Sequence, residues 1–340
     1  MNVFGEYEGK PVEIIRLHNE KLCAEVLSYG ATLRALWVPD RDGKPLDVVL
    51  GFDTLEAYVK HDSCFGATVG PVANRIALAA CPLNGKMLRL TANDRGNCLH
   101  SGVAGLHNKL WDVVERSETA VTLRYVHPNG LGGLPGPVEI ELRYRLDGSA
   151  LLAEYRAISE RDTLFSPTNH SYFNLDGHGS GSVLDHRLRL YAHSFTPTDE
   201  RSIPTGAIRA VSGAALDFTR PVRVGERIDA PNEQLRLAGG YDHNFVIDAG
   251  EEAFRPAAEL WAARSGIKLT VSTDRPGVQL YTGNYIPAGL AGKNGAVYGP
   301  RHGLCLETQG FPDAPHHSAF PSVVLRAGTE WTSRTRFEFT

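Results

Sequence analysis

The clearest periodicity in the sequence is Val138-Glu139-Ile140-Glu141-Leu142-Arg143-Tyr144-Arg145-Leu146. Apolar and aromatic side chains occupy every second position, and charged side chains occupy the positions between them. A period of two residues is that of a β-strand, and this pattern is typical of a strand in an antiparallel sheet with one buried face. Similar segments recur along the chain at Val121–Tyr125, Leu188–Tyr191, Ile267–Val271 and Trp331–Phe339.

Turn signals separate these segments, and helical patterns are few. Asn84-Gly85 is flanked by apolar residues and predicts a hairpin with a type I′ turn, and the best helical pattern, Thr54–Tyr58, is short. Many short strands with little helix indicate a sandwich or a barrel. Because no change of composition marks a boundary, we expect residues 1–340 to form one domain, an all-β protein built as a large antiparallel β-sandwich.

Composition and charge exclude several classes of partner. The formal net charge of the 340 residues is -4, which argues against binding to nucleic acid or to an anionic membrane. No apolar run approaches the roughly 20 residues of a membrane span, and the N-terminus lacks the apolar core of a signal peptide. The five cysteines form no CxxC pair and are odd in number. An odd number of cysteines without paired spacing suits reduced thiols rather than disulfides, so we expect a cytoplasmic protein.

The segment His302–Pro312 places a carboxylate in an apolar strand. Leu304 and Leu306 alternate with Cys305 and Glu307, so Glu307 should lie near the end of a short strand, on the face opposite the leucines. A buried charge must be paired or hydrogen-bonded. Two interpretations therefore stay open: Glu307 points into water at the strand end, or it is a general base in a cleft.

Five further polar clusters lie at expected strand ends or loops. They are Gly70–Ile76 with Asn74 and Arg75, Asn97–Gly102 with His100, Ser166–Leu175 with His170, Ser171 and Tyr172, Gly239–Val246 with Asp242, and Gly277–Tyr285 with Gln279. Arginine offers a planar fork of donors, and histidine titrates near neutrality. Each of these residues taken alone could equally be an exposed loop side chain, a turn cap or part of the sheet packing.

Together the clusters have a chemical character. No nucleophile elbow, phosphate-binding loop, dinucleotide-binding motif or zinc-protease motif occurs in the sequence, and no metal-type spacing. Many directional polar groups without a metal pattern suit a neutral, polyhydroxylated ligand. A histidine acid together with a glutamate base suits proton shuttling.

In this order, the segments resemble the aldose 1-epimerase (galactose mutarotase) family over essentially the whole chain. Additional matching segments are Tyr29–Thr32, Asp47–Phe52, Leu83–Lys86, Phe195–Pro197, Arg201–Gly206 and Phe311–Pro315. The resemblance implies a β-sandwich with a shallow sugar cleft that needs no cofactor or metal. It also implies a free aldose such as galactose or glucose as the substrate, and a monomer or homodimer.

The resemblance also implies residue roles. Glu307 would take the proton of the anomeric hydroxyl while His170 protonates the ring oxygen, so that the pyranose opens, rotates about C1–C2 and closes on the other face. The sugar hydroxyls would be held by Asn74, Arg75, His100, Asp242 and Gln279, with Ser171 and Tyr172 beside the acid. The pKa of a free Glu side chain is about 4.3, and that of a free His side chain is about 6.5. From these values we expect an ionised Glu307 at neutral pH, and a protonated His170 favoured by a nearby carboxylate.

Three alternatives remain at this point. A hexose-6-phosphate 1-epimerase on the same scaffold should carry extra Arg or Lys at the cleft mouth. A glycoside hydrolase would use Asp242 and Glu307 as its two carboxylates. A non-catalytic sugar-binding module could bind hydroxyls with the same polar residues, but would not need both His170 and Glu307.

Overall fold

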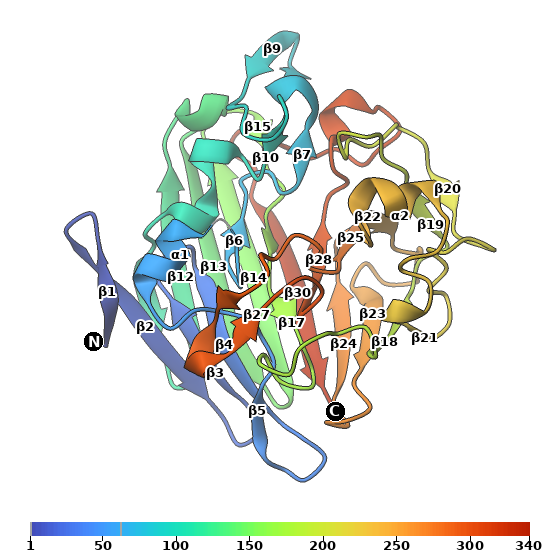
Figure 1. Cartoon of the computed structure of the whole chain (residues 1–340). Helices are drawn as coiled ribbons and strands as arrows, with labels where there is room; N and C mark the ends of the chain where they lie inside the picture. Colours follow the sequence, from blue (N-terminus) through green and yellow to red (C-terminus); the bar gives the residue numbers. More distant parts are fainter. Residues whose placement is uncertain (1, 62) are drawn as a thin grey trace.

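Antiparallel strands are the predominant regular elements of the structure (Figure 1). This computed structural model describes residues 2–61 and 63–340. The largest sheet has nine strands in the order β11-β12-β13-β14-β30-β24-β23-β18-β21. Their bounds are β11 (Asp112–Arg116), β12 (Ala120–His127), β13 (Val138–Asp147), β14 (Ala150–Ser159), β18 (Arg187–Leu190), β21 (Val222–Arg223), β23 (Arg255–Trp261), β24 (Lys268–Thr273) and β30 (Trp331–Phe339).

A second sheet of six strands, in the order β17-β28-β25-β22-β19-β20, packs against the first. Its strands are β17 (Tyr172–Phe173), β19 (Ser194–Thr196), β20 (Arg209–Ala210), β22 (Asp242–Val246), β25 (Gly277–Tyr281) and β28 (Leu304–Gln309). One continuous core cluster holds Leu304 and Leu306 from this sheet together with Phe337 and Phe339 from β30. Two sheets that share one apolar layer form a sandwich, so the predicted fold class is confirmed.

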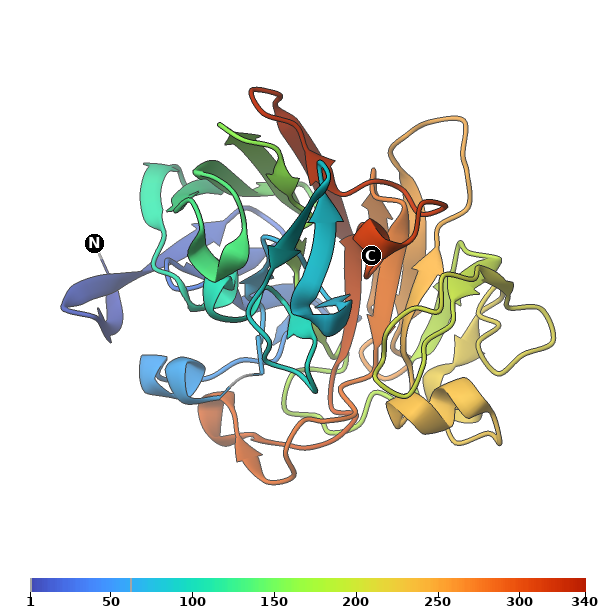
Figure 2. The same ribbon diagram turned by 90° about the horizontal axis from the view of Figure 1, so that it is seen from above.

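The N-terminal strands form a third sheet, a five-stranded meander in chain order. Its strands are β1 (Val3–Tyr7), β2 (Lys10–His18), β3 (Cys23–Leu27), β4 (Thr32–Pro39) and β5 (Pro45–Asp47). Leu17, Val26 and Leu33 from this meander join the same core cluster. In Figure 2, seen from above, the blue strands of the meander extend away from the central layers.

Short ladders and single helical turns connect the sheets. The ladders pair β6 (Thr68–Val69) with β16 (Thr168–Asn169), β7 (Arg75–Ile76) with β10 (Cys98–Leu99), β8 (Ala80–Leu83) with β9 (Lys86–Arg89), β15 (Thr163–Leu164) with β29 (Val324–Leu325), and β26 (Leu290–Ala291) with β27 (Val297–Tyr298). The α-helices are α1 (Leu55–Lys60) and α2 (Glu233–Ala238), and the 3₁₀ turns are η1 (Ala77–Ala79), η2 (Gly102–Ala104), η3 (Leu106–Asn108), η4 (Leu131–Gly133), η5 (Val224–Glu226), η6 (Lys293–Gly295) and η7 (Ala314–His316). Within residues 2–61 and 63–340, no helix has the length and apolar character needed to cross a membrane.

The local sequence signals are confirmed where the pattern was strongest. Along β13, apolar side chains are buried and alternate with exposed or half-buried charged ones. Asn84 and Gly85 have φ of 50° and 74° and join β8 to β9, as a type I′ turn requires. The side chain of Thr54 caps α1 by accepting a hydrogen bond from the backbone N–H of Ala57.

Candidate active site

A cavity of about 440 Å³ opens over the six-stranded sheet, on the side away from the sandwich core. Polar and aromatic side chains line it, contributed by loops, by the β7–β10 ladder and by strands of the sheet. Seven of the nine predicted site residues are in its wall: Asn74, Arg75, His100, His170, Tyr172, Asp242 and Glu307. Residues that are up to 233 positions apart in the sequence (74 to 307) thus meet in one place.

Glu307 lies inside strand β28, which has partners on both sides. β28 pairs with β17 and with β25, and Glu307 stands opposite Gln279 in the register with β25. The strand continues to Gln309, and Glu307 is only 2% exposed. The interpretation of a strand-end Glu in water is therefore wrong, because the polar face of β28 is covered by the cavity wall. The Oε2 atom of Glu307 has no hydrogen-bond partner among the described residues.

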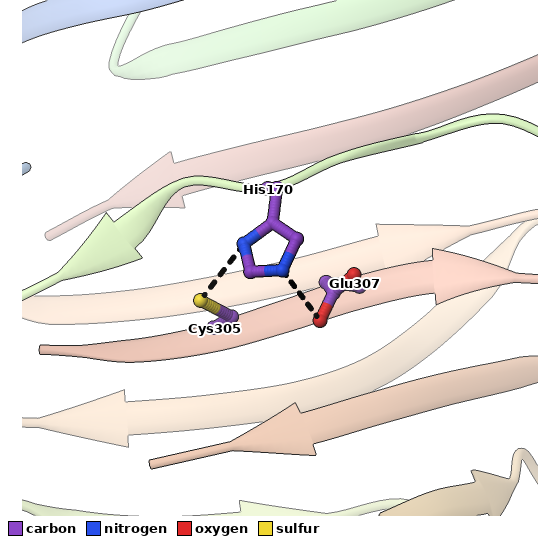
Figure 3. Close-up of side chains that lie close together, drawn as sticks. All are labelled: His170, Cys305 and Glu307. Carbon is purple, nitrogen blue, oxygen red and sulfur yellow. Dashed lines mark hydrogen bonds and ion pairs between the residues drawn. The ribbon is translucent and has the colours of Figure 1, made fainter. Parts of the chain in front are cut away.

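His170 faces Glu307 from the link between β16 and β17. Its Nε2 atom lies 3.6 Å from Oε1 of Glu307, and its Nδ1 atom lies 3.4 Å from Sγ of Cys305 (Figure 3). The ring of Tyr172 stacks on the imidazole, with centroids 5.0 Å apart and planes inclined by 26°. The histidine is thus held with both ring nitrogens engaged and its plane fixed.

The backbone around His170 is fixed by a close chain crossing. The N–H of His170 donates to the carbonyl of Ala67 at 2.9 Å, and the N–H of Gly66 donates to the carbonyl of His170 at 3.0 Å. Gly66 has φ of 68°, and a Cβ added there would overlap the carbonyl of Leu33. Only glycine tolerates both this φ and this approach without strain, so the crossing depends on Gly66.

Burial sets the protonation of the His170–Glu307 pair. It lowers the pKa of His170 to about 4, with a smaller lowering from the charge of His107 and an opposing hydrogen bond to its own backbone. Burial, followed by the charge of Asp242, raises the pKa of Glu307 well above its usual range, and Arg75 opposes this. Both shifts run against the expected charges, an ionised Glu307 and a protonated His170, in the ligand-free protein. Both shifts have the same main cause, because desolvation disfavours both charged forms.

Asp242 provides a second carboxyl group in the cavity, and Gln279 is hydrogen-bonded to it. The Nε2 atom of Gln279 donates to Oδ1 of Asp242 at 2.6 Å. Burial raises the pKa of Asp242, while Arg75 and this hydrogen bond lower it. Gln279 is not among the described residues that line the cavity, and its hydrogen bond orients Asp242. Its role in binding a sugar hydroxyl stays a prediction.

Arg75 and His100 contribute further polar groups to the cavity wall. The Nε of Arg75 donates to Oδ2 of Asp94 at 2.7 Å, which fixes the guanidinium. The backbone N–H of Asn74 donates to Nδ1 of His100 at 3.1 Å. Burial, followed by the charges of His170, His107 and Arg75, lowers the pKa of His100 well below its usual value. The lowered pKa favours the neutral imidazole, and because Nδ1 accepts a hydrogen bond, the ring proton of the neutral form lies on Nε2, where it can be donated to a ligand.

Ser171 lies apart from the predicted residues that line the cavity. It is 1% exposed and is not among the described residues that line the cavity, whereas its neighbours His170 and Tyr172 are. Side chains alternate along extended backbone, so the residue between two cavity-lining neighbours faces away. The role of Ser171 in substrate binding therefore stays a prediction.

Several cavity residues were missed in the sequence. They include His107 and Asn108 on η3, Asn93, and the aromatic pair Tyr281 and Tyr285. Tyr285 is 65% exposed, although its hydroxyl is anchored by donating to the carbonyl of Ala238 at 3.0 Å. Tyr281 lies two residues after Gln279, and its hydroxyl could be seen as a possible ligand contact, but packing within the sheet was an equally good explanation for an aromatic residue there. No local signal distinguished the others.

The donor atoms of His170, Cys305 and Glu307 lie within 4.8 Å of one another, a spacing that a metal ion could use. However, Sγ of Cys305 and Oε1 of Glu307 approach different ring nitrogens of His170 (Figure 3). A metal ion binds one lone pair of the imidazole, so it could not lie between both partners and the ring in this orientation. The arrangement suits a hydrogen bond between Nδ1 and the sulfur and a separate close approach of Nε2 to the carboxyl group.

Comparison with known proteins agrees with this geometry. The sequence model described as aldose 1-epimerase matches residues 13–338. The chain is 43% identical to galactose mutarotase of Bos taurus over 339 residues, covering 99% of this chain and 97% of the relative. It is 32% identical to aldose 1-epimerase of Escherichia coli over 336 residues, covering 98% of this chain and 96% of that protein. The crystal structure of an aldose epimerase homologue from C. elegans superposes with a TM-score of 0.90 at 32% identity, covering 97% of this chain and 99% of the other. The chain therefore belongs to the aldose 1-epimerase family of isomerases.

Proposed function

We propose that this protein interconverts the α and β anomers of a free aldose, such as galactose or glucose, with Glu307 as base and His170 as acid. The observation that carries the proposal is the 3.6 Å approach of His170 Nε2 to Glu307 Oε1 in the wall of a polar cavity. Anomer exchange needs one group to remove the proton of the anomeric hydroxyl and another to protonate the ring oxygen. These two oxygens share one carbon, so an acid and a base that lie close together can serve both.

The single proton of the pair moves through the reaction in a balanced way. When the cyclic sugar binds, the proton passes from the carboxyl group of Glu307 to Nε2 of His170. Glu307 then accepts the anomeric hydroxyl proton, His170 returns its proton to the ring oxygen, and the bond between C1 and the ring oxygen breaks. The open aldehyde rotates about C1–C2, and the reverse transfers close the ring on the other face. The open-chain complex therefore has the same protonation as the ligand-free pair, a carboxylic acid beside a neutral imidazole.

The other cavity groups would hold the sugar hydroxyls. Arg75 and the Nε2–H of His100 are donors, Asp242 is an acceptor, and Asn74 can supply either type of bond. Directional groups of this kind favour a particular hydroxyl arrangement, because a hydroxyl that is absent or inverted leaves a buried partner unsatisfied.

The charge of the cavity favours an unphosphorylated sugar over a hexose 6-phosphate. Arg75 is the single Lys or Arg among the described lining residues, and its Nε is already bound to Asp94. A phosphate group would need further cations. A non-catalytic module is disfavoured for another reason: a buried carboxyl group beside a buried imidazole costs stability, and hydroxyl binding alone does not require the pair.

The assignment is tested by polarimetry on freshly dissolved α-D-galactose, with and without the purified protein. We expect a faster decay to the same final rotation, and the same measurement on glucose, arabinose and xylose then ranks the sugars. No acceleration with any of the four sugars, together with binding detected by calorimetry, would exclude the catalytic assignment.

The pKa shifts predict an unusual pH profile. Activity requires one proton on the pair, and because the pKa of His170 is lowered to about 4, a second proton is added only near that pH. Because the pKa of Glu307 is raised, the first proton is retained well above pH 4.5. On acidification we expect kcat/KM to fall near pH 4, and on the alkaline side we expect activity to extend to a higher pH than the pKa of a free Glu would allow. If Glu307 and His170 instead had the pKa values of free side chains, activity would be confined to the pH range between about 4.3 and 6.5. Initial rates by polarimetry, corrected for the spontaneous reaction, decide this, and a fall in kcat/KM between pH 6 and 7 on acidification would contradict the assignment.

We also propose a cytoplasmic location and a single domain over residues 1–340. All five cysteines are free thiols, which supports a reducing compartment. The core cluster that contains residues of all three large sheets supports one domain. A monomer or homodimer remains the proposed assembly state, which sedimentation of the purified protein would measure.

A further inference from the structure

Cys305 contacts the proposed acid from the same strand that carries the proposed base. It lies two residues before Glu307 on β28, so both side chains emerge on one face. Its side chain is fully buried, and Sγ lies 3.4 Å from Nδ1 of His170 (Figure 3). One strand therefore fixes both partners of the imidazole, with Cys305 at Nδ1 and Glu307 at Nε2.

The proposed reaction requires the two ring nitrogens of His170 to have different tasks. Nε2 gains and loses a proton, so Nδ1 must remain protonated throughout and must have an acceptor. If the neutral ring instead carried its proton on Nε2, that nitrogen could not receive the carboxyl proton of Glu307. The tautomer of a histidine is set by the hydrogen bond of its other nitrogen.

The stacking contact with Tyr172 does not select the tautomer. Tyr172 stacks on the face of the imidazole, which fixes the plane but treats both nitrogens alike. Among the described residues, Sγ of Cys305 is the side-chain atom within hydrogen-bonding distance of Nδ1 of His170. It remains a neutral thiol because burial, followed by the charges of Glu307 and Asp242, raises its pKa well above the usual range. A thiol sulfur is a weak, uncharged acceptor.

We propose that Cys305 is a positioning residue, whose sulfur accepts a hydrogen bond from Nδ1–H of His170 and so leaves Nε2 as the nitrogen that exchanges protons with the sugar. This inference rests on the proposed role of His170. The neutrality of sulfur matters as well, since a carboxylate at Nδ1 would stabilise the imidazolium and retain the proton that must be transferred. Cys305 thus orients the ring without trapping it in the charged form.

The test reads the tautomer directly. Nitrogen-15 NMR of the imidazole rings, at neutral pH and without sugar, shows which nitrogen of His170 carries the proton, and the spectrum of His170→Asn identifies its signals. We expect Nδ1–H in the wild type and in Cys305→Ser, which keeps a hydrogen-bonding atom, and a substantial Nε2–H population in Cys305→Ala. In Cys305→Ala kcat should fall about tenfold, with KM within about twofold, the scale typical of removing the partner that orients a functional histidine.

Cys81→Ala is the matched control. Cys81 is also a fully buried thiol, but it packs in a separate apolar cluster with Ile76 and Leu83. This variant should lose stability while His170 keeps its tautomer and kcat stays unchanged. A wild-type His170 with its proton on Nε2, or a Cys305→Ala variant with the wild-type tautomer, would overturn the inference. The NMR result does not depend on turnover. A protein with the expected tautomer and no mutarotation would refute the proposed function alone, and an active protein with the wrong tautomer would refute the role of Cys305 alone.

Discussion

Glu307→Gln is expected to lower kcat for mutarotation by about 10³ while sugar affinity stays within about threefold. A positioned proton transfer contributes about 10²–10⁴ in rate, and glutamine has nearly the same shape but cannot accept a proton. Its carbonyl oxygen can still accept hydrogen bonds from the sugar, so binding should survive. Polarimetry measures the rate, and calorimetry with the favoured sugar measures the affinity. A variant with turnover close to wild type would remove Glu307 from the role of base.

The stability of the same variant distinguishes loss of chemistry from loss of structure. The folded pKa of Glu307 lies above its unfolded value, so the folded state retains a proton that the unfolded state releases as pH rises through about 4.3. This carboxyl group therefore costs stability above that pH. We expect Glu307→Gln to melt at the same or a higher temperature than wild type at pH 8, with a smaller difference near pH 4. Glu259→Gln, a buried Glu paired with Lys268 in the nine-stranded sheet, is the matched control and should keep full activity.

His170→Asn is expected to lower kcat by about 10²–10³, because no acid then protonates the ring oxygen as its bond to C1 breaks. Asparagine can donate a hydrogen bond but cannot deliver a proton, so KM should change little. The fall in kcat/KM near pH 4 should disappear from the residual activity, since the group responsible for it is gone. His127→Asn is the control. His127 is also buried, with its pKa lowered to about 4, but it lies at the end of β12 and is not among the described lining residues of the cavity. Nearly full turnover in His170→Asn would move the role of acid to His100.

The sandwich was predictable because some of its longest strands have one buried and one exposed face. β13 and β30 show this alternation over their full length, and the prediction for Trp331–Phe339 matches the observed bounds. β28 is different: all six of its residues are buried. Its polar positions face a covered cavity, so the sequence could not reveal that the strand continues past Glu307 to Gln309.

The residues of the site could be predicted, but the protonation behaviour of His170 and Glu307 could not. Polar clusters and the family resemblance located Arg75, His170 and Glu307, yet the expected charges followed pKa values of free side chains. Burial reverses the order of the two pKa values, and burial is a property of the assembled sheets. The contact between Cys305 and His170 likewise follows from the pairing of β17 with β28, which joins segments over 130 residues apart. Local pattern contains no information about such pairing.

The place of β30 in the nine-stranded sheet bears on how the chain acquires its structure during synthesis. This strand follows every other strand in sequence, yet it lies between β14 and β24, where the red ribbon separates the green from the orange (Figures 1 and 2). While the chain is still on the ribosome, the first four strands of that sheet and the last four have no shared neighbour. The two halves are joined only when residues 331–339 emerge and insert between them. Folding of this sheet therefore completes after translation of its final segment, and until then the open edges of β14 and β24 are surfaces that a chaperone could protect.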